Sequence, residues 1–474
     1  MIRIAGLLVV MLLAYPCSAA TLAVRAGATG AANGTNWTDA YTTVGAAYTA
    51  AVRGDVICVA EGTYSENLTH NKANSGTNQI KIVRALDAAR DAGDTYGCRT
   101  LANWLDAFGD GQAHIDGTVT IITNYLTIDG VVRNESDWKS GSAYGFRVTG
   151  PMLGHADNNG TCGDNITVKY ADIGATFSET YTGPYGTFGK GFYLGGFSEG
   201  CTDWTIHRVF IHNSDLAIRL NNTNNVLIEY SLIGWAWSKE IIRAHAGATN
   251  TTMRYNKFEN GCRNDGSGGD PCTAEIAGFR DVGDTTSLYT NFQFYGNTIW
   301  KTVTMQNTDA CVMWDFADNS VIYNNTIHKS TGTGVCTLIL TGSGTTIRNN
   351  IRSVPSGVTT GCSATTCSDN SNYTSSPPFV NATTGDFHLT GALAGFSLPS
   401  PYNTDLDSNI RGADGVFDIG AYEFLVQGSG AIATLSSSAL TPCSGQNARP
   451  GVATVCNTTL TLQNTGNALL TLNS

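Results

Sequence analysis

The stretch NVLIEYSLI, from Asn225 to Ile233, decides the fold. It begins with a polar residue, continues three positions later with the apolar Ile228, and ends with a second apolar residue, Ile233. Because side chains alternate between the two faces of a β-strand, residues two positions apart share a face. We therefore expect a short strand, a corner and a second short strand within this stretch.

The same pattern recurs along the chain. It is found in NITVKYADI (from Asn165), DWTIHRVFI (Asp203), NTTMRYNKF (Asn250), NFQFYGNTI (Asn291), NSVIYNNTI (Asn319) and GTTIRNNI (Gly344), with a looser copy, NYLTIDGVV, at Asn124. The apolar anchors are Val168, Ile206, Ile228, Met253, Phe294, Ile322 and Ile347. Many consecutive anchors lie 22 to 28 residues apart, which fits one turn of a parallel β-helix, and the longer separations fit a turn plus an insertion.

This pattern predicts an all-β fold, a right-handed parallel β-helix. The Asn before most anchors suits a corner, because Asn tolerates left-handed backbone angles and its side chain bonds to nearby backbone groups. An antiparallel sandwich is the alternative, and it accounts less well for an apolar register that repeats along the chain.

The cysteines support stacked coils. Of thirteen, Cys17 lies in the N-terminal segment, and the even number left is typical of disulfides in an oxidising compartment. Similar offsets from the anchors pair Cys162 with Cys201 and Cys311 with Cys336, because rungs stack about 4.8 Å apart. The remaining expected pairs are Cys262–Cys272, Cys362–Cys367 and Cys443–Cys456 as local staples, and Cys58–Cys98.

The N-terminal segment indicates secretion. Residues 1–20 have Arg3 as their only charge, then an apolar run and the small residues SAA, the pattern of a secretory signal peptide. The run is too short to span a bilayer, and no other segment is long and apolar enough. We therefore expect an extracellular or periplasmic protein, and a monomer. The formal charge of −11 argues against nucleic-acid binding.

The two ends of the β-helix carry a family resemblance. Apolar spacing from Tyr41 to Val52 predicts a capping helix that begins at Thr38 or Asp39 and ends at Gly54. The stretches GTNWTDAY and AAVRGDVICVAEGTYSENL around it resemble the N-terminal cap of secreted right-handed parallel β-helix proteins of the pectate-lyase-like superfamily. Their C-terminal closing segment is also present, as PPFVNATTGDFHL and DLDSNIRGADGVFDIGAYEF. The superfamily includes polysaccharide lyases, hydrolases, epimerases and non-enzymatic surface proteins.

The resemblance places the β-helix at residues 21–426. Residues 427–474 begin with a linker and continue with alternating strands that resemble the start of an immunoglobulin-like repeat. About seven strands are needed to close such a sandwich, so we expect an incomplete domain at the end of a truncated chain.

The candidate site is a row of charged residues on the strands that precede the anchors. Alignment of LAIRLN, EIIRAH, AGFRD and VMWDF places Ile218, Ile242, Phe279 and Trp314 inward, and Arg219, Arg243, Arg280 and Asp315 outward in one column. Guanidinium groups on neighbouring rungs repel one another unless carboxylates or an anionic ligand neutralise them. An ordinary solvated face is the alternative.

An acidic polysaccharide, such as a polymer of uronic acids, fits this column. β-Elimination needs a positive charge beside the uronate carboxylate and a base for the C5 proton. Arg243 or Arg280 is the candidate for the first role, His245 for the second, and Lys239 is a further candidate base. EIIRAH also resembles the Glu-Ile-Ile-x-x-Lys stretch of the alginate lyase and chondroitinase B group. The resemblance implies that Glu240 binds Ca²⁺, and His245 stands where that group has its base Lys.

Two further sets of residues complete the prediction. Glu240, Asp281 and Asp315 are candidate oxygen ligands for calcium, although independent surface acids are the simpler alternative. An insertion at Thr176–Phe197 carries Tyr181, Tyr185 and Tyr193, aromatic rings that can stack on sugars or form a small local core.

The sequence thus leads to two functional hypotheses. The first is a secreted carbohydrate-active protein that binds acidic polysaccharide and cleaves it by lyase chemistry, with Arg219 and the tyrosines as further contacts. The second is a non-catalytic surface or adhesion module, which the immunoglobulin-like segment favours.

Overall fold

The computed structural model describes residues 19–155, 161–178, 190–195, 200–214, 216–236, 241–245, 247–260, 289–302, 313–330, 335–356, 359–425, 433–435 and 462–464. For 190, 243–245, 313–317, 335–337, 339–341, 359–360, 433–435 and 462–464 it describes the backbone only.

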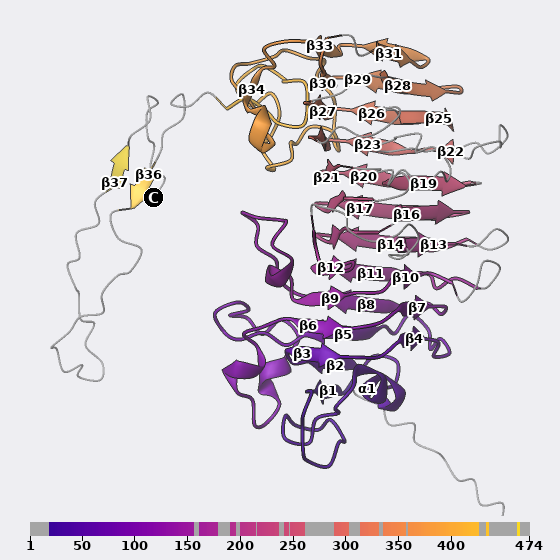
Figure 1. The fold of residues 1–474 in the computed structure, drawn as a ribbon, viewed down its shortest axis with the longest axis vertical. Helices are drawn as coiled ribbons and strands as arrows, with labels where there is room; N and C mark the ends of the chain where they lie inside the picture. The colour runs from indigo at the N-terminus through magenta and orange to yellow at the C-terminus, as the bar shows by residue number, and fades with distance from the viewer. Residues whose placement is uncertain are drawn as a thin grey trace, which may run out of the picture.

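The chain winds into a stack of coils with three parallel faces (Figure 1). We call the twelve-stranded face sheet I. Its strands, in stacking order, are β1 (Thr21–Val24), β2 (Val56–Val59), β5 (Ile80–Arg84), β8 (Leu126–Asp129), β11 (Ile166–Lys169), β14 (Thr202–His207), β17 (Asn224–Glu229), β20 (Thr252–Arg254), β23 (Gln293–Tyr295), β26 (Val321–Tyr323), β29 (Thr346–Arg348) and β32 (Thr366–Ser368).

Each coil of the stack continues from sheet I through a short corner into sheet II. Sheet II consists of β3 (Gly62–Tyr64), β6 (Ala113–Ile115), β9 (Phe146–Val148), β12 (Ala171–Ile173), β15 (Phe210–Ile211), β18 (Leu232–Gly234), β21 (Lys257–Glu259), β24 (Thr298–Lys301), β27 (Thr326–Lys329), β30 (Ile351–Ser353) and β33 (Ser371–Tyr373).

The third face, sheet III, precedes sheet I in each coil. It consists of β4 (Leu68–His70), β7 (Val119–Ile121), β10 (Met152–Leu153), β13 (Lys190–Leu194), β16 (Leu216–Asn221) and β19 (Ile242–His245). Four strands continue the face toward the C-terminus: β22 (Tyr289–Thr290), β25 (Met313–Asp318), β28 (Val335–Thr341) and β31 (Thr359–Ser363).

The predicted anchors form one continuous row in the core. Val168, Ile206, Ile228, Met253, Phe294, Ile322 and Ile347 are paired in this order across neighbouring strands of sheet I, with Ile128 of the looser copy before them, and all have no exposed surface. The sequence therefore predicted both the fold and its register. The stacked, in-register sheets make the chain a right-handed parallel β-helix.

The corners explain the asparagines. Three positions before the anchor, Asn165, Asn225, Asn250, Asn291 and Asn319 have φ between 49° and 58°. These left-handed angles are ones that Asn adopts at lower cost than most residues, as predicted.

A second row of asparagines lies three positions after the anchors, inside the corner between sheets I and II. It consists of Asn256, Asn297, Asn325, Asn350 and Asn370. The side-chain Oδ1 of each of the last four accepts bonds of 2.9–3.1 Å from the backbone N and the Nδ2 of the previous member. We call this row the asparagine ladder, and it satisfies buried backbone groups that a tight corner otherwise leaves unpaired.

Three predicted disulfides are present. Cys162 and Cys201 connect neighbouring coils, Cys58 is bonded to Cys98, and Cys362 is bonded to Cys367. The other three predicted pairs lie outside the residues whose side chains are described.

The N-terminal helix is shorter than predicted. α1 spans Val44–Ala50, and the side chain of Thr43 accepts a bond from the backbone N of Ala46. The prediction that Thr38 or Asp39 begins the helix was wrong. The Asp39 carboxylate instead accepts bonds from the backbone N of Ala31 and the side chain of Asn36, so it holds the preceding loop.

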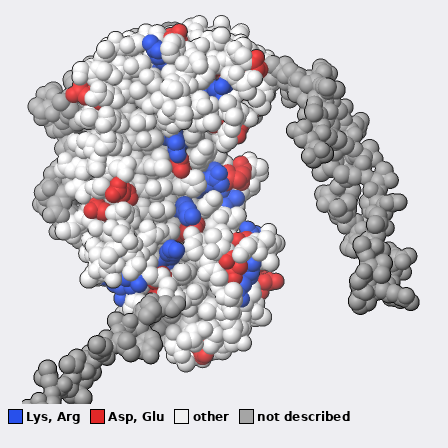
Figure 2. All heavy atoms as spheres, turned by 180° about the vertical axis from the view of Figure 1, so that it is seen from behind, with Lys and Arg blue, Asp and Glu red and all other residues white. Residues whose placement is uncertain are grey.

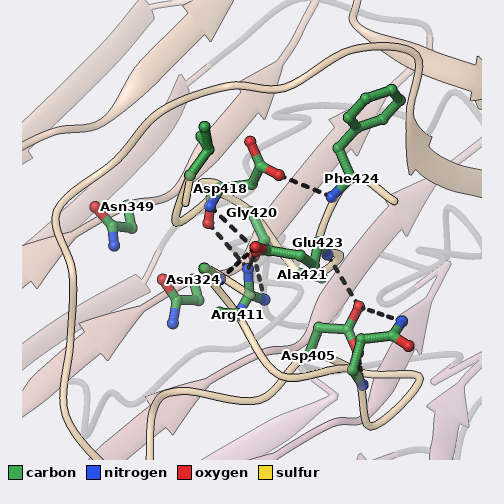
Figure 3. Close-up of polar contacts among 12 residues, drawn as sticks. Asn324, Asn349, Asp405, Arg411, Asp418, Gly420, Ala421, Glu423 and Phe424 are labelled. Atoms are coloured by element: carbon green, nitrogen blue, oxygen red, sulfur yellow. Dashed lines mark hydrogen bonds and ion pairs between the residues drawn. The ribbon is translucent and has the colours of Figure 1, made fainter. Parts of the chain in front are cut away.

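The closing segment, residues 377–424, packs beside the C-terminal rungs (Figure 1). It contains the antiparallel pair β34 (Phe379–Asn381) and β35 (Asp386–Leu389). At its centre the fully buried Arg411 donates hydrogen bonds to the carbonyl oxygens of Thr404, Asp418 and Gly420 (Figure 3). One guanidinium group thus ties the chain at Thr404 to the stretch from Asp418 to Gly420.

Of residues 427–474, the structure describes only an antiparallel pair, β36 (Ala433–Leu435) with β37 (Leu462–Asn464). The predicted domain boundaries and the immunoglobulin-like character of this part stay predictions. The predicted signal peptide is described only at its last two residues. In the described part of the chain, we find no helix with the length and hydropathy of a membrane span.

Candidate functional site

The predicted column lies on the outer side of sheet III. On β16, Ile218 and Leu220 are in the core, and the partly exposed Arg219 points the other way. The register pairs Tyr193 with Arg219 and Arg219 with Arg243. Three of the predicted residues therefore occupy successive rungs of one outward row.

A second row runs beside the first. The register pairs Asn221 on β16 with His245 on β19, two residues along from Arg219 and Arg243. Because strand residues two positions apart share a face, His245 lies on the same side of sheet III as Arg243. This placement follows from the backbone, which the structure describes for both residues.

The side chain of Arg219 is held in place by its neighbours. Its Nε lies 3.3 Å from Oδ1 of Asn221, and its guanidinium carbon lies 4.6 Å from the centre of the Tyr193 ring. Nδ2 of Asn221 in turn lies 3.3 Å from the Tyr193 hydroxyl. The charge of Arg219 is therefore presented at a defined position.

Tyr193, on the rung before Arg219, supports the Arg219 side chain. Its side chain is 3% exposed, and its ring packs edge-on against His155 with ring centres 4.3 Å apart. In this structure its ring is a support for Arg219. The prediction that Tyr193 touches a sugar stays a prediction.

The sequence interpretation missed Asn221 and His155 as parts of this cluster. Asn221 carried a signal, because it lies two residues after Arg219 on the same strand face. His155 carried none, because it follows β10 on a different coil and reaches Tyr193 only through the stacking of the coils.

The remaining candidates lie outside the described residues. They are Lys239, Arg280, Tyr181, Tyr185, Glu240 and Asp281, and for Asp315 only the backbone of β25 is described. The structure therefore does not test the calcium site or the alignment across the insertion.

Sheet I has a different pattern of charges on its outer side. The row one position after the anchors reads Asp129, Lys169, His207, Glu229 and Arg254. Lys169 contacts Asp129 at 2.8 Å, and both His207 (3.0 Å) and Arg254 (2.7 Å) contact Glu229. Figure 2 shows Lys and Arg side chains spaced along the length of the stack, with acidic groups beside several of them. In this row, ion pairs between rungs neutralise Lys169 and Arg254.

The fold and these rows define the class of protein, a disulfide-bonded right-handed parallel β-helix with cations along an outer face. No family model matches the chain, and no curated protein matches it. Solved structures with a similar fold include three carbohydrate-related proteins. Pectate lyase Pel9A has 15% identity, covers 86% of this chain and 97% of its own, and has a TM-score of 0.42.

The second is XylC, solved in complex with xylose. It has 9% identity, with 85% of this chain and 98% of that chain covered and a TM-score of 0.45. A rhamnogalacturonan lyase has 11% identity, covers 85% of this chain and 95% of its own, and has a TM-score of 0.37. These are likenesses to the chain as a whole and add nothing on its activity.

Proposed function

We propose that this protein is a secreted, carbohydrate-active β-helix protein that binds an acidic, uronate-containing polysaccharide along sheet III and cleaves it by β-elimination. The observation that carries the proposal is the register that places Arg219 and Arg243 on neighbouring rungs of one outward row. Neighbouring rungs are about 4.8 Å apart, so the two residues offer a concentrated positive charge to a carboxylate.

The chemistry assigns a role to each residue of the two rows. Arg243 or Arg280 neutralises the uronate carboxylate and so stabilises the negative charge that develops when the C5 proton leaves. His245 takes that proton, with Lys239 as the alternative base. The C4–O bond then breaks, a double bond forms between C4 and C5, and the leaving oxygen takes up a proton.

The substrate contacts are proposed on the same face. Arg219 binds a carboxylate of a neighbouring sugar unit, and Tyr181, Tyr185 and Tyr193 contact sugar rings. A calcium ion held by Glu240, Asp281 and Asp315 is the proposed alternative to arginine as the neutralising charge, because calcium prefers carboxylate oxygens. Addition of a chelator distinguishes the two, since arginine neutralises without metal.

Secretion is part of the proposal. The disulfides that connect separate coils favour an oxidising compartment. The signal-peptide pattern of residues 1–20 agrees with this destination.

The test is a panel of uronate polymers, followed by the ultraviolet absorbance of the unsaturated product. Arg243→Ala is expected to weaken the binding of a uronate oligomer by roughly 1–3 kcal/mol, the range of a charge-assisted contact. His245→Ala is expected to spare binding and abolish turnover. Lys81→Ala, which removes a cation from sheet I, is the control and should match the parent in both assays.

Non-catalytic binding is the second candidate function. The support of Arg219 by Asn221 and Tyr193 favours it, because a cation held in advance binds an anion whether or not a reaction follows. Binding that depends on Arg243 without an unsaturated product would establish this function. A parent protein that binds none of the polymers contradicts both candidates.

A further inference from the structure

The Cys162–Cys201 disulfide lies beside the cation site on sheet III. Cys162 belongs to the corner between β10 and β11, and Cys201 belongs to the equivalent corner between β13 and β14, one coil later. Tyr193, whose ring contacts Arg219, lies on β13 just before the second corner. The disulfide therefore joins the two coils that precede Arg219 in the stack.

One series of contacts runs from the disulfide through His155. The backbone of His155 forms an antiparallel bridge with Cys162, which closes the first corner. The His155 side chain is 4% exposed, and its ring packs edge-on against the Tyr193 ring with the ring centres 4.3 Å apart. A residue that pairs with one cysteine of the disulfide thus touches the ring that supports Arg219.

A second series of contacts runs through Gly154, the neighbour of His155. The backbone N of Gly154 donates a hydrogen bond of 2.8 Å to the carbonyl oxygen of Tyr193. Its own carbonyl oxygen lies 3.6 Å from Sγ of Cys201. A Cβ atom at this position would lie 2.8 Å from Sγ of Cys201 and 3.1 Å from Sγ of Cys162. The first of these contacts is too short for two such atoms, so the disulfide packs against this backbone only because the residue is glycine.

From Tyr193 the contacts continue to the cation. Nδ2 of Asn221 donates to the Tyr193 hydroxyl at 3.3 Å, and Oδ1 of Asn221 accepts from Nε of Arg219, also at 3.3 Å. Tyr193 and Asn221 are 3% and 1% exposed. Closely packed groups transmit a displacement to their neighbours, so a shift of the backbone at Gly154 and His155 reaches Arg219 through these two residues.

We propose that the Cys162–Cys201 disulfide positions Arg219 for binding the carboxylate of an acidic polysaccharide. This inference rests on the function proposed for sheet III and adds the element that positions its cation. The disulfide takes no part in the chemistry. It fixes the backbone beside Tyr193, and Tyr193 and Asn221 fix the direction in which Arg219 meets the ligand. Without the bond, Arg219 has more orientations available, and binding must order it at a cost in entropy.

The test removes the bond and compares the result with a matched control. Cys162→Ala/Cys201→Ala, the disulfide variant, should bind a galacturonate oligomer about tenfold more weakly in calorimetric titration, the loss of one charge-assisted contact. Cys58→Ala/Cys98→Ala is the control and should bind as the parent does. The two disulfides span 39 and 40 residues, so the loss of either should lower stability by a similar amount. Equal weakening in both variants would assign the effect to stability and overturn the proposal.

A single substitution tests the same contacts with the disulfide intact. Gly154→Ala adds a Cβ atom that must displace the sulfur atoms or the backbone beside His155, so its affinity should fall as in the disulfide variant. Gly391→Ala is the matched control, because a Cβ atom there meets nothing within 4 Å. Affinity like that of the parent in Gly154→Ala would show that these contacts do not reach the site.

A measurement without ligand separates this inference from the proposed function. Phenylglyoxal modifies arginine side chains, and mass spectrometry gives the rate at each residue. Arg219 should react several-fold faster in the disulfide variant than in the parent, because its neighbours no longer hold it. Arg208, which is paired with Glu135, should react at the same rate in both proteins. If the parent binds no uronate polymer but this difference is found, the proposed function is wrong and the positioning stands. An unchanged rate at Arg219 overturns the positioning itself.

Discussion

The asparagine ladder makes a quantitative prediction about stability. Asn297 is fully buried. Its Oδ1 accepts bonds from the backbone N (2.9 Å) and Nδ2 (3.1 Å) of Asn256, and its Nδ2 donates to the carbonyl oxygen of Met253 and to Oδ1 of Asn325, both at 3.0 Å. The substitution Asn297→Ala removes all four side-chain hydrogen bonds. It does not require the backbone to change its conformation.

The loss of folding stability depends on which hydrogen bonds each partner of Asn297 retains after the substitution. Nδ2 of Asn256 keeps its bond to Ile228, and Oδ1 of Asn325 keeps the backbone N of residue 297. The backbone N of Asn256 keeps nothing, and an unsatisfied buried donor costs about 1–3 kcal/mol. With about 1 kcal/mol for each of two or three further lost bonds, the expected loss is about 3–6 kcal/mol.

The matched control is Asn291→Gly, in the same coil. Asn291 is exposed, its Nδ2 donates one bond of 2.9 Å to Asn250, and its φ is 57°. Glycine accepts that φ without strain, so the control should lose less than about 1 kcal/mol. Urea unfolding followed by circular dichroism measures both variants. If Asn297→Ala is no less stable than Asn291→Gly, the ladder does not carry the stability assigned to it.

Further predictions concern the core, the closing segment and one disulfide. Met253→Ala opens a cavity between rungs and should cost about 2–5 kcal/mol in a thermal melt, while uronate binding stays unchanged. Because the pKa of His388 is raised from 6.5 to about 9 in the folded state, its contribution to stability should be complete below pH 6.5 and lost as the pH rises through about 9, and His388→Gln should abolish this pH dependence of the melting temperature. Arg411→Met leaves the buried carboxylate beside it uncompensated and should cost about 3–5 kcal/mol in urea unfolding, with earlier proteolytic release of the closing segment. Non-reducing peptide mapping should find Cys311 bonded to Cys336, and free thiols there would contradict the spacing argument.

The core of this protein could be predicted because the same few positions of each coil supply it. In a parallel β-helix, each coil repeats the same positions, so an apolar residue at a fixed place in the repeat must stack on its equivalents in the next coil. This is why Val168, Met253 and Ile347 were aligned correctly across insertions of different length.

The ladder was readable in the same way but was missed. Asn256, Asn297 and Asn325 each follow their anchor by three residues, a spacing as regular as that of the apolar positions. An interpretation based on apolar residues alone overlooks it, because a buried polar residue reveals its role only through the bonds it makes.

The surface could not be predicted to the same degree. The bond from Arg133 to the carbonyl oxygen of Tyr230 joins residues of different coils, and Trp138 packs against an apolar cluster that residues of the sheets and of the closing segment build together. Neither contact repeats from coil to coil, so no periodic pattern in the sequence predicts it.

The coil repeat also sets the spacing of the row on sheet III that contains Arg219 and Arg243. In-register stacking brings equivalent positions within about 5 Å, where two like charges repel by roughly 3 kcal/mol at an effective dielectric constant of 20. On sheet I the chain avoids this cost, because neighbouring rungs pair Lys169 with Asp129 and Arg254 with Glu229. Arg219 and Arg243 are placed on neighbouring rungs of sheet III.

Lys301 and Lys329 are also paired in register, at the ends of β24 and β27, and both are buried at 1% exposure. Arg219 differs from them because it is partly exposed, so a ligand from solvent can reach it. Folding stability alone favours rows in which positive and negative side chains alternate, as they do on sheet I. A ligand that carries its own negative charge can approach the partly exposed Arg219 from solvent, and the acidic polysaccharide proposed above should therefore be tested on sheet III first.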